Sequence, residues 1–354
     1  MRRYWQKLLN WVRFHKKQVY IGSAIFLSLL LIFLIFVAIN KKDTVVDRTE
    51  VEQVEKKSSS LVRSPLTGNL VKPSLAERPV TAIVIENSPD SRPQSGLSSA
   101  GVVFEAIAEG GITRYIALYQ EARPSLIGPV RYLRPYFNDW VMAFDASIAH
   151  VGGSAVALHE ARNKFKLKDL DQFFHPQTYW RATDRFAPHN VYTNFKRLDK
   201  LNQQKKYTKS EFEPLERKKP NPLKKPKAGT INLTISSDLY NVRYVYDKKS
   251  NSYKRFLGGE KHINRESKKQ IAPDVVVALK ISNRAKSNGR WYYDLVGSGV
   301  AMVFQDGGWK KGTWKRSGRD KQIELVKGSK TIKLNYGRVW FTAVSPDSKI
   351  KYSK

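Results

Sequence analysis

The stretch SIAHVGGSAVALHEAR (residues 147–162) predicts a β-strand that runs through a glycine pair into an α-helix. Residues 147–151 form a short strand-like run that ends at Gly152 and Gly153. Ser154 then has the side chain of a helix N-cap, and residues 155–162 continue as a helix. A strand that leads directly into a helix is typical of α/β folds. We therefore predict an α/β domain around this stretch.

The segments upstream support this fold class. Three runs bounded by turn-forming residues predict strands: TAIVIE (81–86), VVFEAI (102–107) and RYIALYQ (114–120). Residues 135–145 predict a helix whose aromatic and apolar residues share one face: Tyr136, Phe137, Trp140, Val141 and Phe144. The predicted α/β domain extends over residues 78–205.

The C-terminal part, residues 230–354, has a different pattern. It contains short runs rich in Val, Tyr and Ile, separated by Asn-Gly, Asp-Gly-Gly and Gly-Ser turn signals. The runs cover residues 241–257, 275–281, 291–304 and 331–344. We predict a β-rich antiparallel C-terminal domain, either a sheet or a small barrel. Residues 206–229, with four prolines and few apolar groups, are the predicted linker between the two domains.

Residues 19–40 (VYIGSAIFLSLLLIFLIFVAIN) carry no charge and are long enough for a transmembrane helix, which needs about 20 residues. A cleaved signal peptide is the alternative, but its apolar region is usually about 7–15 residues and ends at a small-x-small site. The run here is longer, and Val37-Ala38 is a poor cleavage site. We therefore expect one uncleaved membrane anchor before the two domains.

The flanks of this span predict its orientation. Residues 1–18 are basic, whereas only Lys41 and Lys42 follow the span directly before a stretch of mixed sign. The more basic flank stays in the cytoplasm. We expect a single-pass protein of the cell membrane with a cytoplasmic N-terminus and extracytoplasmic domains. Residues 41–77, which are poor in apolar groups, are the predicted flexible stalk.

The composition excludes several classes of site. The chain of 354 residues has 41% hydrophobic residues, enough for a core, and no cysteine. Disulfides, cysteine-ligated zinc, a thiol nucleophile and a lipid attached to an N-terminal cysteine are therefore excluded. His150 and His189 lack a third ligand at metal-binding spacing. We predict neither a metal nor a cofactor.

The net charge of +32 is unevenly distributed. Residues 1–78 have a net charge of +8 and residues 79–200 of +2, whereas residues 201–354 reach +22. A field of this sign concentrates polyanions. The expected partners are an anionic envelope polymer or anionic lipid head groups, with extracellular DNA less favoured. The stretch WKKGTWKR (309–316) interleaves aromatic and basic residues, which suits stacking, although core-facing tryptophans of a hairpin explain it equally well.

The candidate ligand-binding residues are polar and gather at predicted turns. Arginine forks suit phosphate or carboxylate groups, and a helix N-terminus such as that at Ser154 presents free N–H groups to an anion. The alternative is that these arginines pair with Glu105, Glu109, Asp145 or Asp184 and fasten loops. Ser154 lacks the G-x-S-x-G context of a hydrolase nucleophile. The candidates are Glu105, Glu109, Arg114, Arg131, Arg134, His150, Ser154, Arg181, Arg185, His189 and Asn190.

Several long stretches resemble the YerB-like family of uncharacterised bacterial extracytoplasmic proteins. In the first domain these are RPVTAIVIEN (78–87), RPQSGLSSAGVVFEAIAEGGITR (92–114), IGPVRYLRPYF (127–137), HVGGS (150–154) and WRATDRFAPHNVYT (180–193). In the second they are GSGVAMVFQDGGWKKGTW (297–314) and NYGRVWF (335–341). The resemblance implies an extracytoplasmic protein with two domains, and it implies no reaction. Members usually carry a lipid-modified cysteine, which this chain replaces with its predicted transmembrane helix. Tyr132 and Leu133 also stand where the family has small residues.

Three hypotheses for function remain open. The first is a membrane-anchored protein of the cell envelope that binds an anionic cell-wall or lipid-linked component. The second is an enzyme of envelope polymer assembly that acts on a phosphate-bearing substrate, by analogy with enzymes that place arginines at strand ends outside the membrane. The third is a scaffold that binds wall-synthesis proteins. An enzyme would gather the candidate residues in one concave site.

Overall fold

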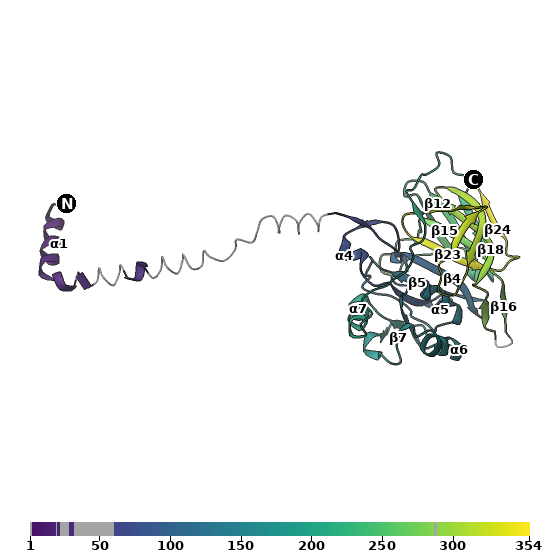
Figure 1. Cartoon of the computed structure of the whole chain (residues 1–354), viewed down its shortest axis with the longest axis horizontal. Coiled ribbons are helices and arrows are strands. Elements are labelled where there is room, and N and C mark those ends of the chain that lie inside the picture. The colour runs from purple at the N-terminus through teal and green to yellow at the C-terminus, as the bar shows by residue number, and fades with distance from the viewer. Residues whose placement is uncertain (1, 19, 22–27, 32–59, 287–288) are drawn as a thin grey trace. The chain divides into compact units, whose positions relative to one another are not determined.

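A computed structural model describes residues 2–18, 20–21, 28–31, 60–286 and 289–354 in two units, residues 1–60 and 61–354. The first unit contains helix α1 (Arg2–Phe14) (Figure 1). Much of the predicted span and stalk lies outside the described residues. Within the described residues, no helix combines the length and the apolar character needed to cross a membrane.

Residues 61–77, predicted as the end of the stalk, instead pack into the second unit. They form β1 (Val62–Arg63), β2 (Leu70–Val71) and the short helix α4 (Pro73–Ala76). Leu66 is 1% exposed and belongs to the main core. The stalk prediction missed the burial of Leu66, because it rested on the predominantly polar composition of residues 41–77 as a whole.

The second unit is built on one mixed sheet of eleven strands, which joins both predicted domains. Its strands, in spatial order, are β21 (Lys330–Thr331), β20 (Glu324–Lys327), β19 (Gly308–Arg316), β18 (Gly297–Gln305), β15 (Val275–Lys280), β23 (Val339–Val344), β4 (Val102–Glu109), β5 (Ile112–Tyr119), β3 (Thr81–Glu86), β6 (Ser147–His150) and β7 (Lys168–Asp171).

The two faces of this sheet are covered by different elements. On one face, α5 (Pro135–Met142) and α6 (Ala155–His159) pack on alternate residues such as Val84 and Phe104. On the other face, α7 (Phe195–Gln204) covers the neighbouring set, which includes Ile85 and Val103. Successive strand residues point to opposite faces, so the near-continuous apolar runs of β3 and β4 are buried on both sides.

A second, antiparallel sheet covers the C-terminal end of the large one. Its strands, in spatial order, are β14 (Glu260–Lys261), β13 (Ser252–Leu257), β12 (Val242–Asp247), β11 (Thr230–Leu233) and β24 (Ile350–Ser353). The inner side chains Ile231 and Tyr244 form a core with Val276 and Phe304 of the large sheet. This sheet lies beside β15, β18 and β23 (Figure 1).

Short paired strands and single turns complete the unit. The pairs are β8 (Trp180–Arg181) with β9 (Val191–Tyr192), β10 (Arg217–Lys218) with β22 (Leu334–Asn335), and β16 (Asn283–Ala285) with β17 (Trp291–Tyr293). The 3₁₀ turns are Pro89–Ser91, Leu97–Ser99, Pro176–Thr178 and Asp238–Tyr240.

The N-terminal elements follow the prediction closely. The strand at 81–86 has the predicted bounds, and the helix at residue 155 begins after Ser154, whose hydroxyl accepts a hydrogen bond from Ala157 N. Helix α6 ends at His159, and a π-helical turn (Glu160–Lys164) continues it two residues past the predicted end at Arg162.

The C-terminal part differs from the antiparallel prediction at the short strand β22, which is parallel to β10, and at the longer strand β23. Strand β23 lies between β15 and β4 and is parallel to both. All six of its residues are buried, and all except Thr342 are apolar, as is usual for a parallel strand covered on both faces. The unit is therefore strand-rich with mixed sheets, and β23 of the C-terminal segment pairs with β4 of the N-terminal one.

The predicted linker 206–229 is an ordered strap in the structure. Ser210 accepts a hydrogen bond from Val80 N, and Phe212 packs against Phe144 with ring centroids 5.5 Å apart. Strand β10 then pairs with β22. These contacts hold the strap to both segments that it connects.

Candidate functional site

Three of the predicted site residues form one ion-pair cluster. Glu109, at the end of β4, accepts hydrogen bonds from Nη2 of Arg114 at 2.6 Å and from Nε of Arg134 at 2.8 Å. Burial opposes ionisation of Glu109, but the two guanidinium groups outweigh it and hold its carboxyl pKa below the usual range. Arg114 also donates to Tyr132 O, which ties β5 to the segment before α5. The cluster therefore links the end of β4 and the start of β5 to the segment before α5.

Arg131 belongs to a neighbouring cluster around Glu86, a residue that the sequence analysis missed. Nε of Arg131 lies 2.9 Å from Glu86 Oε1. The other carboxylate oxygen lies 3.0 Å from Nδ1 of His189, without hydrogen-bond geometry. The Glu86 side chain is 4% exposed. The one signal for it in the sequence is an acidic residue at the end of an otherwise apolar strand.

The two clusters meet at Tyr132. Its ring lies 4.6 Å from the guanidinium of Arg131 and 6.0 Å from that of Arg134. The structure therefore brings five of the candidates, Glu109, Arg114, Arg131, Arg134 and His189, to one neighbourhood. Each of these arginines already holds a carboxylate, so the pairing alternative describes the geometry.

His150 and Ser154 face other partners. The ring nitrogens of the fully buried His150 contact Gly152 O and Asp169 Oδ1, each at 2.8 Å. Burial raises the pKa of Asp169, but contacts with His150 and Arg162 outweigh it and hold the value at about 2. The hydroxyl of Ser154 caps α6. These residues join β6 to β7 and to the helix.

The remaining candidates fasten a loop. Arg181 donates to the side-chain oxygen of Asn190 at 2.7 Å, and Asn190 donates to Ala182 O. Arg185 donates to Asp90 O and Pro93 O. Arg181 and Asn190 thus form hydrogen bonds within the segment 181–190, and Arg185 connects this segment to residues 90–93.

Glu105 belongs to a buried network that joins the two segments. Its carboxylate accepts from Nη2 of Arg255 at 2.9 and 3.0 Å, and from Nε1 of Trp340 at 3.0 Å. Both side chains of the pair are 0% exposed. Burial would lower the pKa of Arg255, but Glu105 holds it above its usual range. Arg255 was not predicted, because its partner lies 150 residues away in the sequence.

The network continues through His262 in one direction. Nε of Arg255 can only donate, so Nδ1 of His262 accepts at 3.0 Å. Nε2 of His262 then carries the proton and donates to Gln94 Oε1 at 2.8 Å. Burial, and then the charge of Arg255, hold the pKa of His262 well below its ordinary value. Gln94 in turn donates to Glu86 O, so the network reaches the Glu86 cluster.

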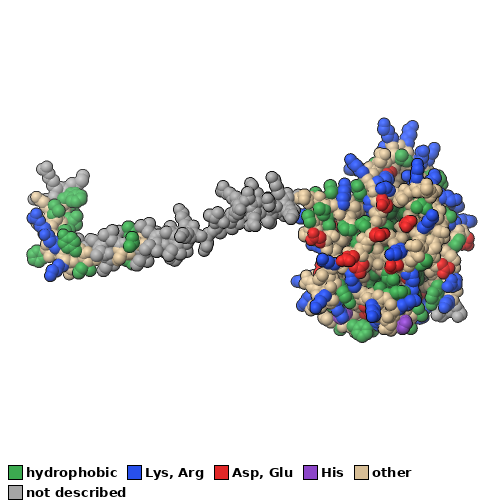
Figure 2. Space-filling view, viewed as in Figure 1, with side chains coloured by type: hydrophobic (Ala, Val, Ile, Leu, Met, Phe, Trp, Pro, Cys, Tyr) green, Lys and Arg blue, Asp and Glu red, His purple; other side chains and the backbone are tan. Residues whose placement is uncertain are grey.

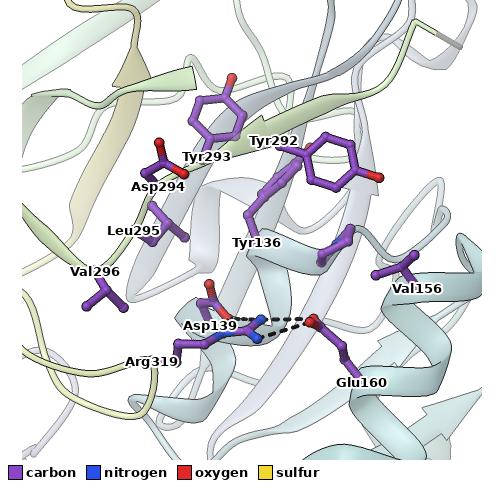
Figure 3. A pocket seen from close by; sticks show the side chains of 11 residues that line it. Tyr136, Asp139, Val156, Glu160, Tyr292, Tyr293, Asp294, Leu295, Val296 and Arg319 are labelled. Carbon is purple, nitrogen blue, oxygen red and sulfur yellow. Dashed lines mark hydrogen bonds and ion pairs between the residues drawn. The ribbon is translucent and has the colours of Figure 1, made fainter. Parts of the chain in front are cut away.

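A groove of about 440 Å³ lies between the two segments (Figure 3). Arg319 bridges its floor, with Nε 2.5 Å from Asp139 Oδ1 and Nη1 3.0 Å from Glu160 Oε1. Burial raises the pKa of Asp139 to about 6, although Arg319 partly opposes this. Asp294 and Tyr292 line the opposite wall.

The charges of this groove do not suit an anion. The lining contains three carboxylates, those of Asp139, Glu160 and Asp294, and one guanidinium, that of Arg319. Arg319 holds Asp139 and Glu160, and Asp294 pairs with Arg284. None of the candidate residues from the sequence lines it. In the described part of the chain, no group of three or more His, Asp or Glu side chains could hold a metal ion. The groove and the arginine clusters are therefore separate features.

Comparison with known proteins identifies the family. Residues 66–208 match the family described as "Protein of unknown function (DUF3048) N-terminal domain", and residues 231–341 match its C-terminal domain. The chain belongs to the DUF3048 family. A DUF3048 relative, the Bacillus subtilis (strain 168) protein described as "Putative lipoprotein YerB", is 33% identical over 329 residues, which cover 90% of this chain and 94% of the relative.

The fold of this DUF3048 protein is similar to one solved by crystallography. The crystal structure of the YerB protein from Bacillus subtilis matches with a TM-score of 0.74 and 31% identity, over 82% of this chain and 99% of that one. The resemblance found in the sequence is confirmed, together with a strand-rich fold in two segments. Residues 209–229 of the predicted linker lie between the two DUF3048 matches, and its first three residues lie within the N-terminal match.

Proposed function

We propose that this chain is a membrane-anchored, extracytoplasmic protein of the cell envelope that binds an anionic envelope component through its C-terminal segment. The observation that carries the proposal is the excess of exposed, unpaired lysines in residues 201–354. This segment has 35 Lys and Arg against 13 Asp and Glu. Basic side chains crowd the part of the surface that β12 and its neighbouring strands occupy (Figures 1 and 2).

Few of these lysines have an acidic partner. Lys218, Lys254, Lys321 and Lys333 pair with carboxylates. Within residues 201–286 and 289–354, no other lysine forms an ion pair, including the exposed Lys261, Lys310, Lys327, Lys330 and Lys351. A lysine without an acidic partner keeps its full field at the surface, where it attracts polyanions.

The pairing of the arginines in the N-terminal segment also favours the C-terminal segment as the place where the ligand binds. Arg114, Arg131 and Arg134 are held by Glu109 and Glu86, so an anion would have to displace a carboxylate to reach them. The exposed lysines require no such displacement. The proposed binding surface is therefore the C-terminal segment.

Two features support the anchor. The uncharged residues 19–40 have the composition of a membrane span, with the basic flank before it. Helix α1 places Trp5, Leu8 and Leu9 on one exposed face, with Lys7 and Arg13 elsewhere on the helix. Cationic amphipathic helices of this kind lie in the membrane interface. The description of YerB as a lipoprotein also fits an anchored, extracytoplasmic protein.

A binding titration tests the function. The full chain, in neutral detergent, should bind poly(glycerol phosphate), and log affinity should fall linearly with log salt as counterions are released. Absence of binding at low salt both to this polymer and to phosphatidylglycerol vesicles, or binding that does not change with salt, would show that the lysines only maintain solubility.

A protease experiment tests the topology. A tag placed after Lys354 should be degraded by protease added to spheroplasts, while the full-length protein remains in the membrane fraction. A protected tag, or a soluble mature form that begins near residue 39, would contradict the proposed anchor.

A further inference from the structure

The outer face of the five-stranded sheet carries a row of side chains that crosses all five strands. The register pairs Lys261 with Phe256, Phe256 with Arg243, Arg243 with Asn232, and Asn232 with Lys351. We call these five residues the cross-strand row. Their immediate chain neighbours, such as Leu233, Val242 and Leu257, point into the core. The row therefore lies on the solvent side.

The row has the dimensions of a site for an extended chain. Adjacent strands lie about 4.8 Å apart, so five strands span about 19 Å. Lys261 and Lys351 are exposed at the two ends, and Arg243 occupies the middle position. Cations are thus distributed along a line rather than gathered at a point. A linear polyanion meets such a line with several charges at once.

Arg243 is held in a defined orientation. Its guanidinium lies 3.8 Å from the centroid of the Phe256 ring. Stacking on the ring orders the planar group, and the described residues provide no acidic partner for it. A fork of this kind can donate two hydrogen bonds to the oxygens of one phosphate. The amide of Asn232 can supply a further donor beside it.

A groove of about 670 Å³ adjoins the row. Asn232, Arg243 and Lys351 line it together with Lys349 and the exposed Leu239. Asp238 is the one carboxylate among the lining residues, and it accepts a hydrogen bond from Asn241. Three cations against one carboxylate leave the groove positive, in contrast to the groove at Arg319.

We propose that the cross-strand row and this groove bind a linear phosphodiester polymer with polyol units between its phosphates. The proposal rests on the proposed function and gives it a location and a ligand class. The phosphates match the line of cations, and the carbon units match Leu239. A bilayer surface fits less well, because Phe256, the large apolar side chain of the row, lies under Arg243.

Two triple variants of the full chain test this location. The row variant is Lys261→Gln, Arg243→Gln and Lys351→Gln. The matched control is Lys310→Gln, Lys327→Gln and Lys330→Gln, which removes the same charge from exposed positions of β19, β20 and β21. Binding of labelled poly(glycerol phosphate) is measured in neutral detergent over a series of salt concentrations. Thermal melts confirm that both variants fold.

The row variant should bind at least about tenfold more weakly at low salt, and its log–log salt slope should decrease by about 2. The control should lose less than about threefold. A third variant, Arg243→Lys, keeps the charge but loses the fork, so it should show a smaller loss of about threefold with an almost unchanged slope.

The other outcomes separate the two proposals. An equal loss in the row variant and the control, or a loss in the control alone, overturns the row and leaves the proposed function standing. Binding to phosphatidylglycerol vesicles without binding to the polymer overturns the polymer as the ligand of the row. If the unsubstituted chain binds neither at low salt, both proposals fail.

Discussion

Residues 79–200 carry 14 Lys and Arg against 12 Asp and Glu, whereas residues 201–354 carry 35 against 13. In the first region nine of the 14 basic residues are arginines. Arg114, Arg131 and Arg134 hold the buried or half-buried carboxylates Glu86 and Glu109. In the second region most are exposed lysines without an acidic partner. Charge in the first region therefore maintains the structure, and charge in the second is available to a ligand.

Several arginines of the second region behave like those of the first, among them Arg319, which holds Asp139 and Glu160, and Arg255. Arg255 tests the division most sharply. Its fully buried guanidinium holds Glu105 across the joint between the segments. Arg255→Ala would leave that carboxylate buried and unpaired, which costs about 3–5 kcal/mol. We expect the thermal midpoint of the full chain to fall by roughly 10 °C.

The control for this prediction is Lys310→Ala, an exposed lysine that should change stability by less than about 0.5 kcal/mol. A midpoint for Arg255→Ala within 2 °C of the control, a margin set by roughly 0.5 kcal/mol, would contradict the structural role of the pair. The same contacts imply that residues 230–354 should be studied within the full chain, because Arg255 has its partner in β4.

The second prediction compares two arginines of the first region. Arg131→Ala leaves Glu86, whose side chain is 4% exposed, with His189 alone. The side chain of Glu109 is 31% exposed in the structure, and in Arg134→Ala it would still be paired with Arg114. Urea unfolding should show a loss of about 3 kcal/mol for Arg131→Ala and about half of that for Arg134→Ala. The reverse order would show that exposure of the carboxylate does not decide the loss.

Much of the fold could be predicted from local sequence patterns, but the contacts that join the N-terminal and C-terminal segments could not. Strand β3 and the cap at Ser154 follow from apolar runs and turn residues close in the chain. The insertion of β23 beside β4, and the pairing of Arg255 with Glu105, depend on partners far apart in the sequence. Among the candidate site residues, clustering at turns in the sequence could not show which of them lie together or that carboxylates already hold the arginines, because Glu86 and Arg131, for example, are 45 residues apart.

The third prediction concerns His262 in the same buried network. Its pKa is depressed in the folded protein, so below the unfolded value of about 6.5 the unfolded chain binds a proton that the folded chain excludes. Its contribution to stability is therefore present above pH 6.5 and is lost as the pH falls. The loss approaches about 1.4 kcal/mol per pH unit.

His262→Gln provides the test, because glutamine can accept from Arg255 and donate to Gln94 without titrating. Urea unfolding at pH 6.5, 6.0 and 5.5 should show a smaller loss of stability for this variant than for the unsubstituted chain. Parallel curves would show that another group causes the pH dependence. Asp139 acts in the opposite direction, because its raised pKa of about 6 removes stability as the pH rises from about 4 to 6.

The smallest effect on stability is expected for the exposed lysines, and it sharpens the comparison most directly. Lys310, Lys327 and Lys330 are exposed and form no ion pair among the described residues. Substituting each with Gln should change the free energy of unfolding by less than about 0.5 kcal/mol. Removal of mutual repulsion can even stabilise the fold slightly. If the triple variant instead lost several kcal/mol, these lysines would be structural, and the division between structural arginines and available lysines would fail.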